Sequence, residues 1–399
     1  MIIRPQYMDT LRTYRDVPLV KILAGIRRCG KSTILDMLRD DLRSSGILPD
    51  HIISMRYTSE DFDSGMTDKD MYNDIKKQMT DNERYYLLLD EVQEIDGWEK
   101  AVNSLLENAN TDIYVTGSNS RLMASEISTY LTGRYISIPV YTLSFAEFLK
   151  FKESDPRSRR ELLNEYLRLG GFPIVALGSF DERSAYQIVE GIYNSVITSD
   201  ITKRHGIMNF DLFNRVVKYI VENVGKTFSA NAIAKFLKSE GRSLSVETVY
   251  NYLNWLESAF VIYRCRRYDL QGKAVLRTQE KFYLADQSLK YCVMGFNPKS
   301  IASMLENIVY FELRRRGYDV YIGKNEKKEI DFVAVRRDER IYVQVCRRLP
   351  EESDREVANL LEIRDQYPKY VVTLDELAAG NIDGVKIVHL ADFLLAEYY

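Results

Sequence analysis

Residues 25–32, GIRRCGKS, fit the pattern G-x-x-x-x-G-K-S/T of a phosphate-binding loop. An apolar run at 19–24 precedes this loop, and apolar residues at helical spacing follow it. A strand that leads through a glycine turn into a helix directs several backbone N–H groups at one point, where they can bind phosphate oxygens. The pattern predicts a nucleotide site, against the alternative of a chance match in a turn. The residues expected to contact the nucleotide are Gly25, Arg27, Arg28, Cys29, Gly30, Lys31, Ser32 and Thr33.

Four side chains have the types that phosphoryl transfer needs. Lys31 is expected to neutralise the β- and γ-phosphates of ATP, and Ser32 to offer its hydroxyl to Mg²⁺. Residues 85–89, YYLLL, form a continuous apolar run typical of a buried strand, and the run ends in Asp90 and Glu91. Asp90 is the expected metal carboxylate, and Glu91 is placed to orient or deprotonate the attacking water.

Two further positions are candidates for contact with the γ-phosphate. Ser118 and Asn119 follow the apolar run at 113–116, and either could act as a sensor that hydrogen-bonds the phosphate or the attacking water; an ordinary polar turn is the alternative. Arg134 precedes the run at 135–140. It is a candidate to stabilise the charge on the transferred phosphoryl group, in its own subunit or in a neighbouring one, and a surface ion pair is the competing interpretation.

Composition bounds the class of protein. The 399 residues are 45% hydrophobic and 28% charged, which predicts a globular chain of two or three domains. The net charge of -3 means that a nucleic-acid surface would have to be a local patch. The four cysteines are widely separated, without a C-x-x-C pair, which argues against a zinc site or a disulfide framework. No signal peptide or membrane span is recognisable, so we expect a cytoplasmic protein without a membrane partner.

The first 150 residues alternate strand-like and helix-like segments. This alternation predicts a P-loop α/β domain over 1–150, with a parallel sheet that binds its ligand at the carboxyl ends of the strands. The expected strands are residues 19–24, 52–57, 85–89, 113–116 and 135–140.

The middle of the chain is mainly helical in pattern. Residues 151–206 are expected to form a helical lid or connector, with a break at 170–173, GGFP. Over 207–290 we expect a winged helix with one helix at 210–223 and two more that begin at the N-cap residues Ser229 and Ser245. A hairpin of strands at 261–266 and 281–284 would form the wing.

A winged helix often reads DNA with its third helix. Protein docking or a lid role is the alternative, because the third helix also carries Glu247 and Glu257. The candidate DNA contacts are Ser245, Thr248, Tyr250, Asn251, Arg264, Arg266, Arg267, Lys273 and Arg277.

Residues 291–399 return to an α/β pattern, with a helix at 305–316 and strands at 320–322, 330–335 and 341–345. Glu306, Asp331 and Gln344 have the order of a metal-dependent nuclease core of the PD-(D/E)XK type. Cys346 stands where such a core has its lysine, and Gln344 is neutral where a carboxylate would bind metal more tightly. We therefore expect a degenerate domain that does not cut DNA, in which Asp331 with Glu306 or Glu329 would hold an ion weakly.

The motifs GIRRCGKS, YYLLLDEVQEIDGWE, VTGSNS, LTGRY, LSFAEFL and LRLGGFP, followed by LENIVYFELRRRGYDVY, EIDFVAV and YVQVC, resemble prokaryotic AAA-type (AAA_14-like) ATPases with a C-terminal DUF4143 domain. The resemblance implies a P-loop core, a winged helix and a nuclease-like domain, with Arg134 in the family's GR motif. It implies ATP hydrolysis and does not supply a substrate. From the residues we expect a Mg²⁺-dependent ATPase whose nucleotide state drives or switches the downstream module, with DNA, a protein partner or a second copy as candidate partners. The alternatives are an ATP-gated DNA-binding regulator with slow turnover and an ATP-dependent nuclease.

Overall fold

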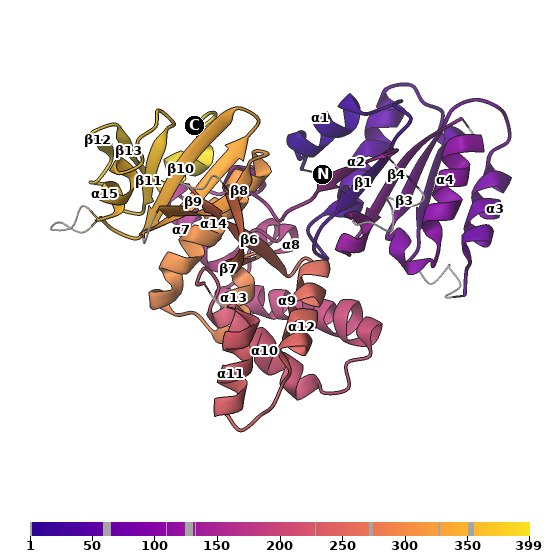
Figure 1. Ribbon diagram of the computed structural model, residues 1–399. Helices are drawn as coiled ribbons and strands as arrows, with labels where there is room; N and C mark the ends of the chain where they lie inside the picture. The colour runs from indigo at the N-terminus through magenta and orange to yellow at the C-terminus, as the bar shows by residue number, and fades with distance from the viewer. Residues whose placement is uncertain are drawn as a thin grey trace. The chain divides into compact units, whose positions relative to one another are not determined.

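The chain folds into two compact units in the computed structural model (Figure 1). The first comprises Met1–Val140 with Ser258–Phe260, and the second comprises Tyr141–Glu257 with Val261–Tyr399. The structure describes residues 2–58, 65–108, 110–123, 131, 133–227, 229–270, 274–325, 328–349 and 355–399.

The first unit is built on a five-stranded sheet of order β2-β3-β4-β1-β5, in which every neighbouring pair is parallel. This confirms the predicted α/β fold with a parallel sheet. The three inner strands are buried along their whole length, which explains their continuous apolar sequences. The strands are β1 (Val20–Ala24), β2 (Ile52–Arg56), β3 (Tyr85–Asp90), β4 (Thr111–Gly117) and β5 (Tyr135–Pro139).

Helices cover both faces of this sheet (Figure 1). The helix α1 (Pro5–Thr13) packs on α2 (Lys31–Ser44) on one face, and α3 (Asp68–Gln78) packs on α4 (Trp98–Asn108) on the other. Short 3-10 turns follow at η1 (Pro49–His51), η2 (Val92–Glu94) and η3 (Ser120–Met123).

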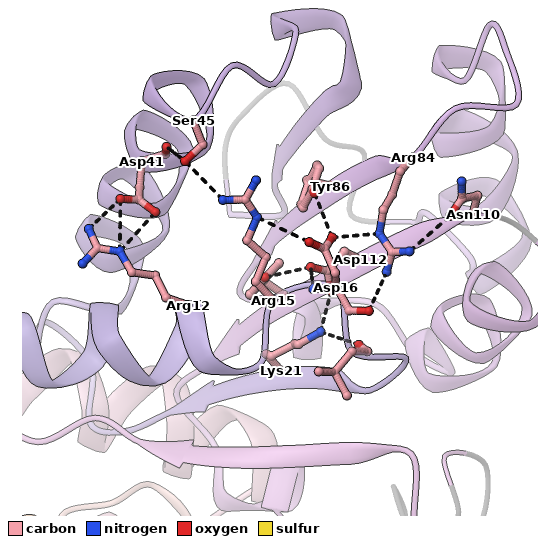
Figure 2. Close-up of polar contacts among 12 residues, drawn as sticks. Arg12, Arg15, Asp16, Lys21, Asp41, Ser45, Arg84, Tyr86, Asn110 and Asp112 are labelled. Atoms are coloured by element: carbon pink, nitrogen blue, oxygen red, sulfur yellow. Dashed lines mark hydrogen bonds and ion pairs between the residues drawn. The ribbon is translucent and has the colours of Figure 1, made fainter.

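The amino ends of the strands carry a buried polar cluster (Figure 2). Lys21 of β1 donates to Asp112 of β4 over 2.5 Å between Nζ and Oδ1, and neither side chain is exposed. The N–H of Asp16 donates to the other oxygen of Asp112 at 2.9 Å. The Asp16 carboxylate accepts a bond from Tyr86 at 2.8 Å and pairs with Arg84 at 3.0 Å. Because loss of Lys21 or Asp112 would leave the other buried charge without its partner, this pair stabilises the amino edge of the sheet, and Asp16 and Arg84 extend it toward the solvent.

The second unit contains a helical part and an eight-stranded sheet of order β12-β13-β11-β10-β9-β8-β6-β7. Its helices are α6 (Phe145–Phe151), α7 (Arg159–Leu169), α8 (Pro173–Leu177), α9 (Glu182–Ser195), the π-helix η4 (Val196–Lys203), α10 (Phe210–Glu222), α11 (Ala230–Ser239), α12 (Val246–Ser258), α13 (Ser288–Met294), η5 (Pro298–Ser300), α14 (Ile301–Arg315), α15 (Arg355–Leu361) and α16 (Leu390–Leu395). Its strands are β6 (Ile262–Asp269), β7 (Ala274–Leu284), β8 (Asp319–Asn325), β9 (Lys328–Arg336), β10 (Glu339–Cys346), β11 (Lys369–Thr373), β12 (Gly380–Ile382) and β13 (Val385–His389).

The helical part follows the predicted order closely. Ser229 accepts a bond from the N–H of Ala232, and Ser245 accepts one from Thr248, so both serines are N-caps. The chain turns at Gly170, whose φ is 78°, and the N–H of Gly171 donates to the buried carboxylate of Asp286 at 2.8 Å.

The predicted wing differs from the structure. The strands β6 and β7 pair as an antiparallel hairpin, but β6 also pairs in parallel with β8, where Arg267 lies opposite Ile322. The hairpin is therefore the edge of the large sheet and not a free wing. Residues 141–257 and 261–399 together form one compact unit, and the boundaries expected at 150, 206 and 290 stay predictions. Within the described residues, none of the helices is long and apolar enough to cross a membrane.

Candidate nucleotide-binding site

The loop between β1 and α2 has a backbone that requires glycine at two positions. A Cβ at Gly25 would lie 2.0 Å from the carbonyl oxygen of Val140, so no side chain fits between them. Gly30 is the N-cap of α2 and has a φ of 105°, which other residues rarely adopt. The first N–H groups of a helix have no partner within the helix. The loop therefore presents backbone donors at the start of a 14-residue helix.

Lys31 points back into this loop. Its ammonium donates to the carbonyls of Gly25 at 3.0 Å and Ile26 at 3.3 Å, and it lies 3.5 Å from Oε1 of Glu91. Only 3% of Lys31 is exposed. The carbonyls that hold this buried ammonium are only weakly basic, so the charge of Lys31 is available to an anion that enters the loop. Lys31 is therefore suited to bind the β- and γ-phosphates of a nucleotide.

Asp90, the last residue of β3, lies beside the first turn of α2. Its Oδ1 accepts from the hydroxyls of Ser32 at 3.0 Å and Thr116 at 2.5 Å, and its Oδ2 pairs with Nε of Arg56 at 3.0 Å. Mg²⁺ prefers oxygen ligands and takes only one or two from the protein when phosphates and water supply the rest. The juxtaposed hydroxyl and carboxylate of Ser32 and Asp90 fit that donor set.

Glu91 directly follows the strand and adopts a left-handed conformation with φ 56°. Its N–H donates to the hydroxyl of Thr116 at 2.9 Å, and its Oε2 accepts from the amide of Gln93 at 2.5 Å. Burial alone would raise the pKa of Glu91, but the charge of Lys31, the bond from Gln93 and the charge of Arg27 together lower it below its ordinary value. The carboxylate therefore stays ionised at neutral pH, as an acceptor for a water proton must.

Ser118 and Asn119 follow β4 on the same edge of the sheet, and each is only 3% exposed. The hydroxyl of Ser118 lies 3.5 Å from the Gln93 amide that contacts Glu91. The carbonyl of Asn119 accepts a bond from the N–H of Leu122 at 3.1 Å, so these residues also form a turn. Both interpretations of this segment, a sensor and a turn, are compatible with the geometry.

The remaining loop residues differ in what they can contribute. Cys29 is fully buried, burial raises the pKa of its thiol, and its carbonyl accepts from Arg4 at 3.0 Å. It can therefore offer only its backbone. Arg28 is exposed and has a φ of 67°, Arg27 is partly exposed, and Thr33 is exposed in the first turn of α2.

Arg134 does not lie near this loop within its own unit. Its carbonyl accepts a bond from the N–H of Val20 at 2.9 Å, which places Arg134 where β1 and β5 begin, at the amino edge of the sheet. Its guanidinium pairs with Glu107 at 2.6 Å, with 47% of the arginine side chain exposed. The phosphate loop follows the other end of β1, so this position gives no support to a role of Arg134 in its own subunit. The role in a neighbouring subunit stays a proposal, and the pair with Glu107 fits the competing interpretation of a surface ion pair.

The sequence patterns missed three residues that complete the site: Arg56, Gln93 and Thr116. Each lies at, or directly after, the carboxyl end of a predicted strand. A parallel sheet binds its ligand at the carboxyl ends of its strands, and this rule predicts the position of Asp90. Once the order of the strands is known, the same rule applies to Arg56 and Thr116.

Two of the predicted DNA contacts in the second unit are engaged with carboxylates. Arg264 pairs with Glu280 at 2.8 Å and with Glu257 at 3.1 Å, and Arg267 pairs with Glu329 at 2.6 Å. Of the hairpin arginines that the structure describes in full, Arg266 is the exposed one. Lys273 lies outside the described residues, and the side chain of Arg277 is likewise not described.

The nuclease-like residues do come together, around a lysine that the sequence pattern did not indicate. Lys281 of β7 lies 3.2 Å from Glu306, 2.9 Å from Glu329 and 3.9 Å from Asp331. The amide oxygen of Gln344 accepts from the N–H of Asp331 at 3.3 Å.

These groups shift one another's proton affinities. Burial would lower the pKa of Lys281, but Glu306, Asp331 and Glu329 raise it above its ordinary value. Burial raises the pKa of Glu306, and burial together with the charge of Glu306 raises that of Asp331. Cys346 is partly buried, and the pKa of its thiol is raised to about 11.

Comparisons with known proteins support the class of the first unit. A family model described as an AAA domain matches residues 18–149, and DUF8612, a domain of unknown function, matches residues 160–300. The family model that matches after the AAA domain is therefore DUF8612, and the DUF4143 part of the resemblance is not shown. A Walker-type ATPase of Pyrococcus abyssi has the same fold, with a TM-score of 0.53, 13% identity and coverage of 73% of this chain and 96% of that one.

An uncharacterized protein of Haemophilus influenzae is 38% identical over 398 residues, which cover 99% of each chain. An uncharacterized protein of Methanocaldococcus jannaschii is 28% identical over 358 residues, covering 85% of this chain and 77% of the other. This chain therefore belongs to the family of the Haemophilus influenzae protein, and its first unit is an AAA-type P-loop domain.

Proposed function

We propose that this protein binds ATP with Mg²⁺ in its first unit and hydrolyses it. The observation that carries the proposal is the convergence of two sequence-distant motifs: Lys31 lies 3.5 Å from Glu91, and Ser32 lies 3.0 Å from Asp90. The AAA-domain match and the fold shared with a Walker-type ATPase support the same conclusion.

Each side chain has one part in this mechanism. The ammonium of Lys31 leaves the loop carbonyls and binds the β- and γ-phosphates, while the backbone donors of the loop and α2 hold the phosphate chain in place. Ser32 and Asp90 would hold Mg²⁺, which would supply positive charge against the developing charge of the transferred group. Glu91 accepts a proton from the attacking water, and Gln93 holds the Glu91 carboxylate in its orientation.

The experiment compares ATP binding and turnover in the wild type, Lys31→Ala and Glu91→Gln. Lys31→Ala is expected to lose tight binding because the phosphates lose their buried cation. Glu91→Gln is expected to bind ATP normally and to lose turnover by roughly 10²-fold or more, the usual effect of removing a general base. Hydrolysis by Glu91→Gln at the wild-type rate would refute the role of Glu91, and tight ATP binding by Lys31→Ala would refute the site.

We further propose that the nucleotide state switches the second unit, which carries the helices α10, α11 and α12 and the acidic cluster around Lys281. The ion pairs of Arg264 and Arg267 leave Arg266 as the described hairpin arginine best suited to contact DNA. Turnover measured with and without single- and double-stranded DNA tests this function. If added DNA does not change turnover, and if no salt-dependent binding of DNA is measured, the switch acts on a protein partner instead.

Arg134 remains a proposed catalytic residue only between copies of the chain. Its position at the amino edge suits contact with the nucleotide of a neighbouring subunit, where it would stabilise charge on the transferred group. Arg134→Ala should then lower turnover at protein concentrations where copies associate, and leave it unchanged at high dilution. An equal effect at all concentrations would contradict a role between subunits.

A further inference from the structure

Arg56 occupies a position in the nucleotide site that the phosphoryl-transfer roles do not explain. It is the last residue of β2 and lies directly opposite Asp90 in the register of β2 and β3. Its Nε lies 3.0 Å from Oδ2 of Asp90, so a guanidinium contacts the carboxylate that is proposed to hold the metal.

The other contacts of Asp90 make Arg56 its electrostatic partner. Among the described residues, Oδ1 of Asp90 accepts from neutral hydroxyls, those of Ser32 and Thr116. In the described part of the unit, Arg56 therefore balances the charge of this nearly buried carboxylate, which is 5% exposed. A divalent ion beside Asp90 would repel the guanidinium, because like charges a few ångströms apart interact strongly where water is scarce.

Arg56 also has a second carboxylate within reach. Its Nη2 lies 3.9 Å from Oδ2 of Asp36, which is on α2 one turn after Ser32. More than half of the Arg56 side chain, 55%, is exposed, whereas only 7% of the Asp90 side chain is exposed. Oδ1 of Asp36 already pairs with Arg39 at 3.0 Å, and Arg56 faces the other oxygen. The guanidinium can therefore turn from Asp90 to Oδ2 of Asp36, which it would share with Arg39, without rearrangement of the core.

We propose that Arg56 competes with Mg²⁺ for Asp90, and that Asp36 receives the arginine when the metal binds. Arg56 thus sets the concentration of divalent ion at which nucleotide and metal load together, and it keeps Asp90 neutralised in the empty site. This inference rests on the proposed function, since it assigns a regulatory residue to the same site.

Manganese binding measured by electron paramagnetic resonance, in the presence of a non-hydrolysable ATP analogue, tests the competition without relying on turnover. In Arg56→Gln the free Mn²⁺ needed for half-saturation should fall roughly threefold to tenfold, as expected for the loss of a half-exposed competing cation. In Asp36→Asn it should rise, because Arg56 loses its alternative partner.

Arg12→Gln is the matched control. Arg12 pairs with Asp41 at 2.6 Å at the far end of α2, and 52% of its side chain is exposed, close to the value for Arg56 (Figure 2). This control should leave the half-saturation unchanged, which separates a local effect from a change in net charge.

The outcomes are distinct. If the wild type takes up Mn²⁺ with the nucleotide and Arg56→Gln does so at the same concentration, the competition is wrong and the proposed function stands. If Arg56→Gln needs more free Mn²⁺ for half-saturation than the wild type does, Arg56 favours metal binding and the inference is reversed. If the wild type takes up neither nucleotide nor Mn²⁺, the proposed function fails and this inference fails with it. The Asp36→Asn variant changes a partly exposed surface residue and keeps the test open should Arg56→Gln not fold.

Discussion

Asp90 receives two hydroxyl hydrogen bonds and one ion pair, so protein groups alone hold the carboxylate that is proposed to bind the metal in a defined orientation. Thr116 is central to this arrangement, because its hydroxyl donates to Asp90 and accepts the N–H of Glu91. One buried side chain thereby sets the positions of both acidic residues relative to β4.

The first prediction concerns Thr116. In Thr116→Val, which has nearly the same shape, the N–H of Glu91 loses its acceptor, which should cost about 1–3 kcal/mol of stability. Turnover should fall roughly tenfold or more, because Asp90 and Glu91 lose their common anchor, while the affinity for ATP stays nearly constant. Thr116→Ser keeps the hydroxyl and serves as the control. Equal turnover in the Val and Ser variants would mean that the hydroxyl does not position these acids.

The sequence identified the loop, Lys31, Ser32, Asp90 and Glu91 because each belongs to a short motif with fixed spacing. Arg56 and Thr116 belong to no motif, and their proximity to Asp90 depends on the order of β2, β3 and β4 in the sheet. That order is a property of the fold and not of local spacing. Arg134 shows the converse, because a correct strand prediction still left open which edge of the sheet the residue occupies.

At the scale of elements, the loop depends on the close approach of the end of β5 to the end of β1. Val140 donates its N–H to Ala24 at 2.7 Å, and its carbonyl then passes directly over Gly25. The parallel pairing of these two strands therefore leaves no room for a side chain at the first position of the phosphate loop.

The second prediction is that Gly25→Ala destabilises the first unit and weakens nucleotide binding. The added Cβ would lie 2.0 Å from a backbone oxygen that cannot move without separating β1 from β5. We expect a loss of about 3 kcal/mol, the upper end for overpacking. Gly191→Ala, in α9 with nothing within 4 Å of the added Cβ, should be neutral or stabilising in the same denaturation experiment. A Gly25→Ala protein with wild-type stability and affinity would show that the strands separate easily.

The hairpin of β6 and β7 was predictable as a hairpin but not as a sheet edge. Its apolar residues, such as Cys265 and Phe282, are buried and indicate a face that packs on protein, and both a wing and a sheet edge have one. The deciding contact is with β8, which begins at Asp319, 35 residues after the hairpin ends at Leu284. For the same reason Lys281 could not be assigned to the acidic cluster from its own neighbours in sequence.

The third prediction concerns Lys281. Replacing this buried ammonium by Met leaves Glu306, Glu329 and Asp331 without their shared cation, which should cost about 3–5 kcal/mol near neutral pH. The matched control is Lys328→Met in β9, where the lysine pairs with the exposed Glu362 and its loss should cost under about 1 kcal/mol.

The deficit should depend on pH in a defined direction. The pKa values of Glu306 and Asp331 are already raised in the folded protein, so their protons favour folding at low pH, and this benefit is lost as the pH rises through the folded-state values. Without Lys281 the pKa values of Glu306 and Asp331 rise further, so the loss of folding stability extends to higher pH, toward neutrality. Denaturant melts at several pH values should therefore show a small deficit near pH 5 that grows toward pH 8. A deficit independent of pH would mean that Lys281 acts through packing and not through its charge.

At the scale of the whole molecule, the chain places its nucleotide site in one compact unit and its acidic cluster in another. Each unit has a sheet and a buried core of its own, so each can unfold in its own transition. A ligand stabilises the transition of the unit that binds it, by an amount that depends on its concentration relative to its dissociation constant.

The last prediction is that calorimetry separates the two units by their responses. A non-hydrolysable ATP analogue with Mg²⁺, at about one hundred times its dissociation constant, should stabilise the first unit by about 2.7 kcal/mol, or roughly 5–10 °C. Lys31→Ala should abolish this shift, and Lys281→Met should lower the other transition. If ligand and Lys281→Met instead move a single common transition, the two units unfold together, and the free energy of nucleotide binding is then shared by the unit that carries Lys281. A nucleotide can switch the second unit through the free energy of folding only if this sharing occurs. The experiment therefore decides whether the switch acts in this way.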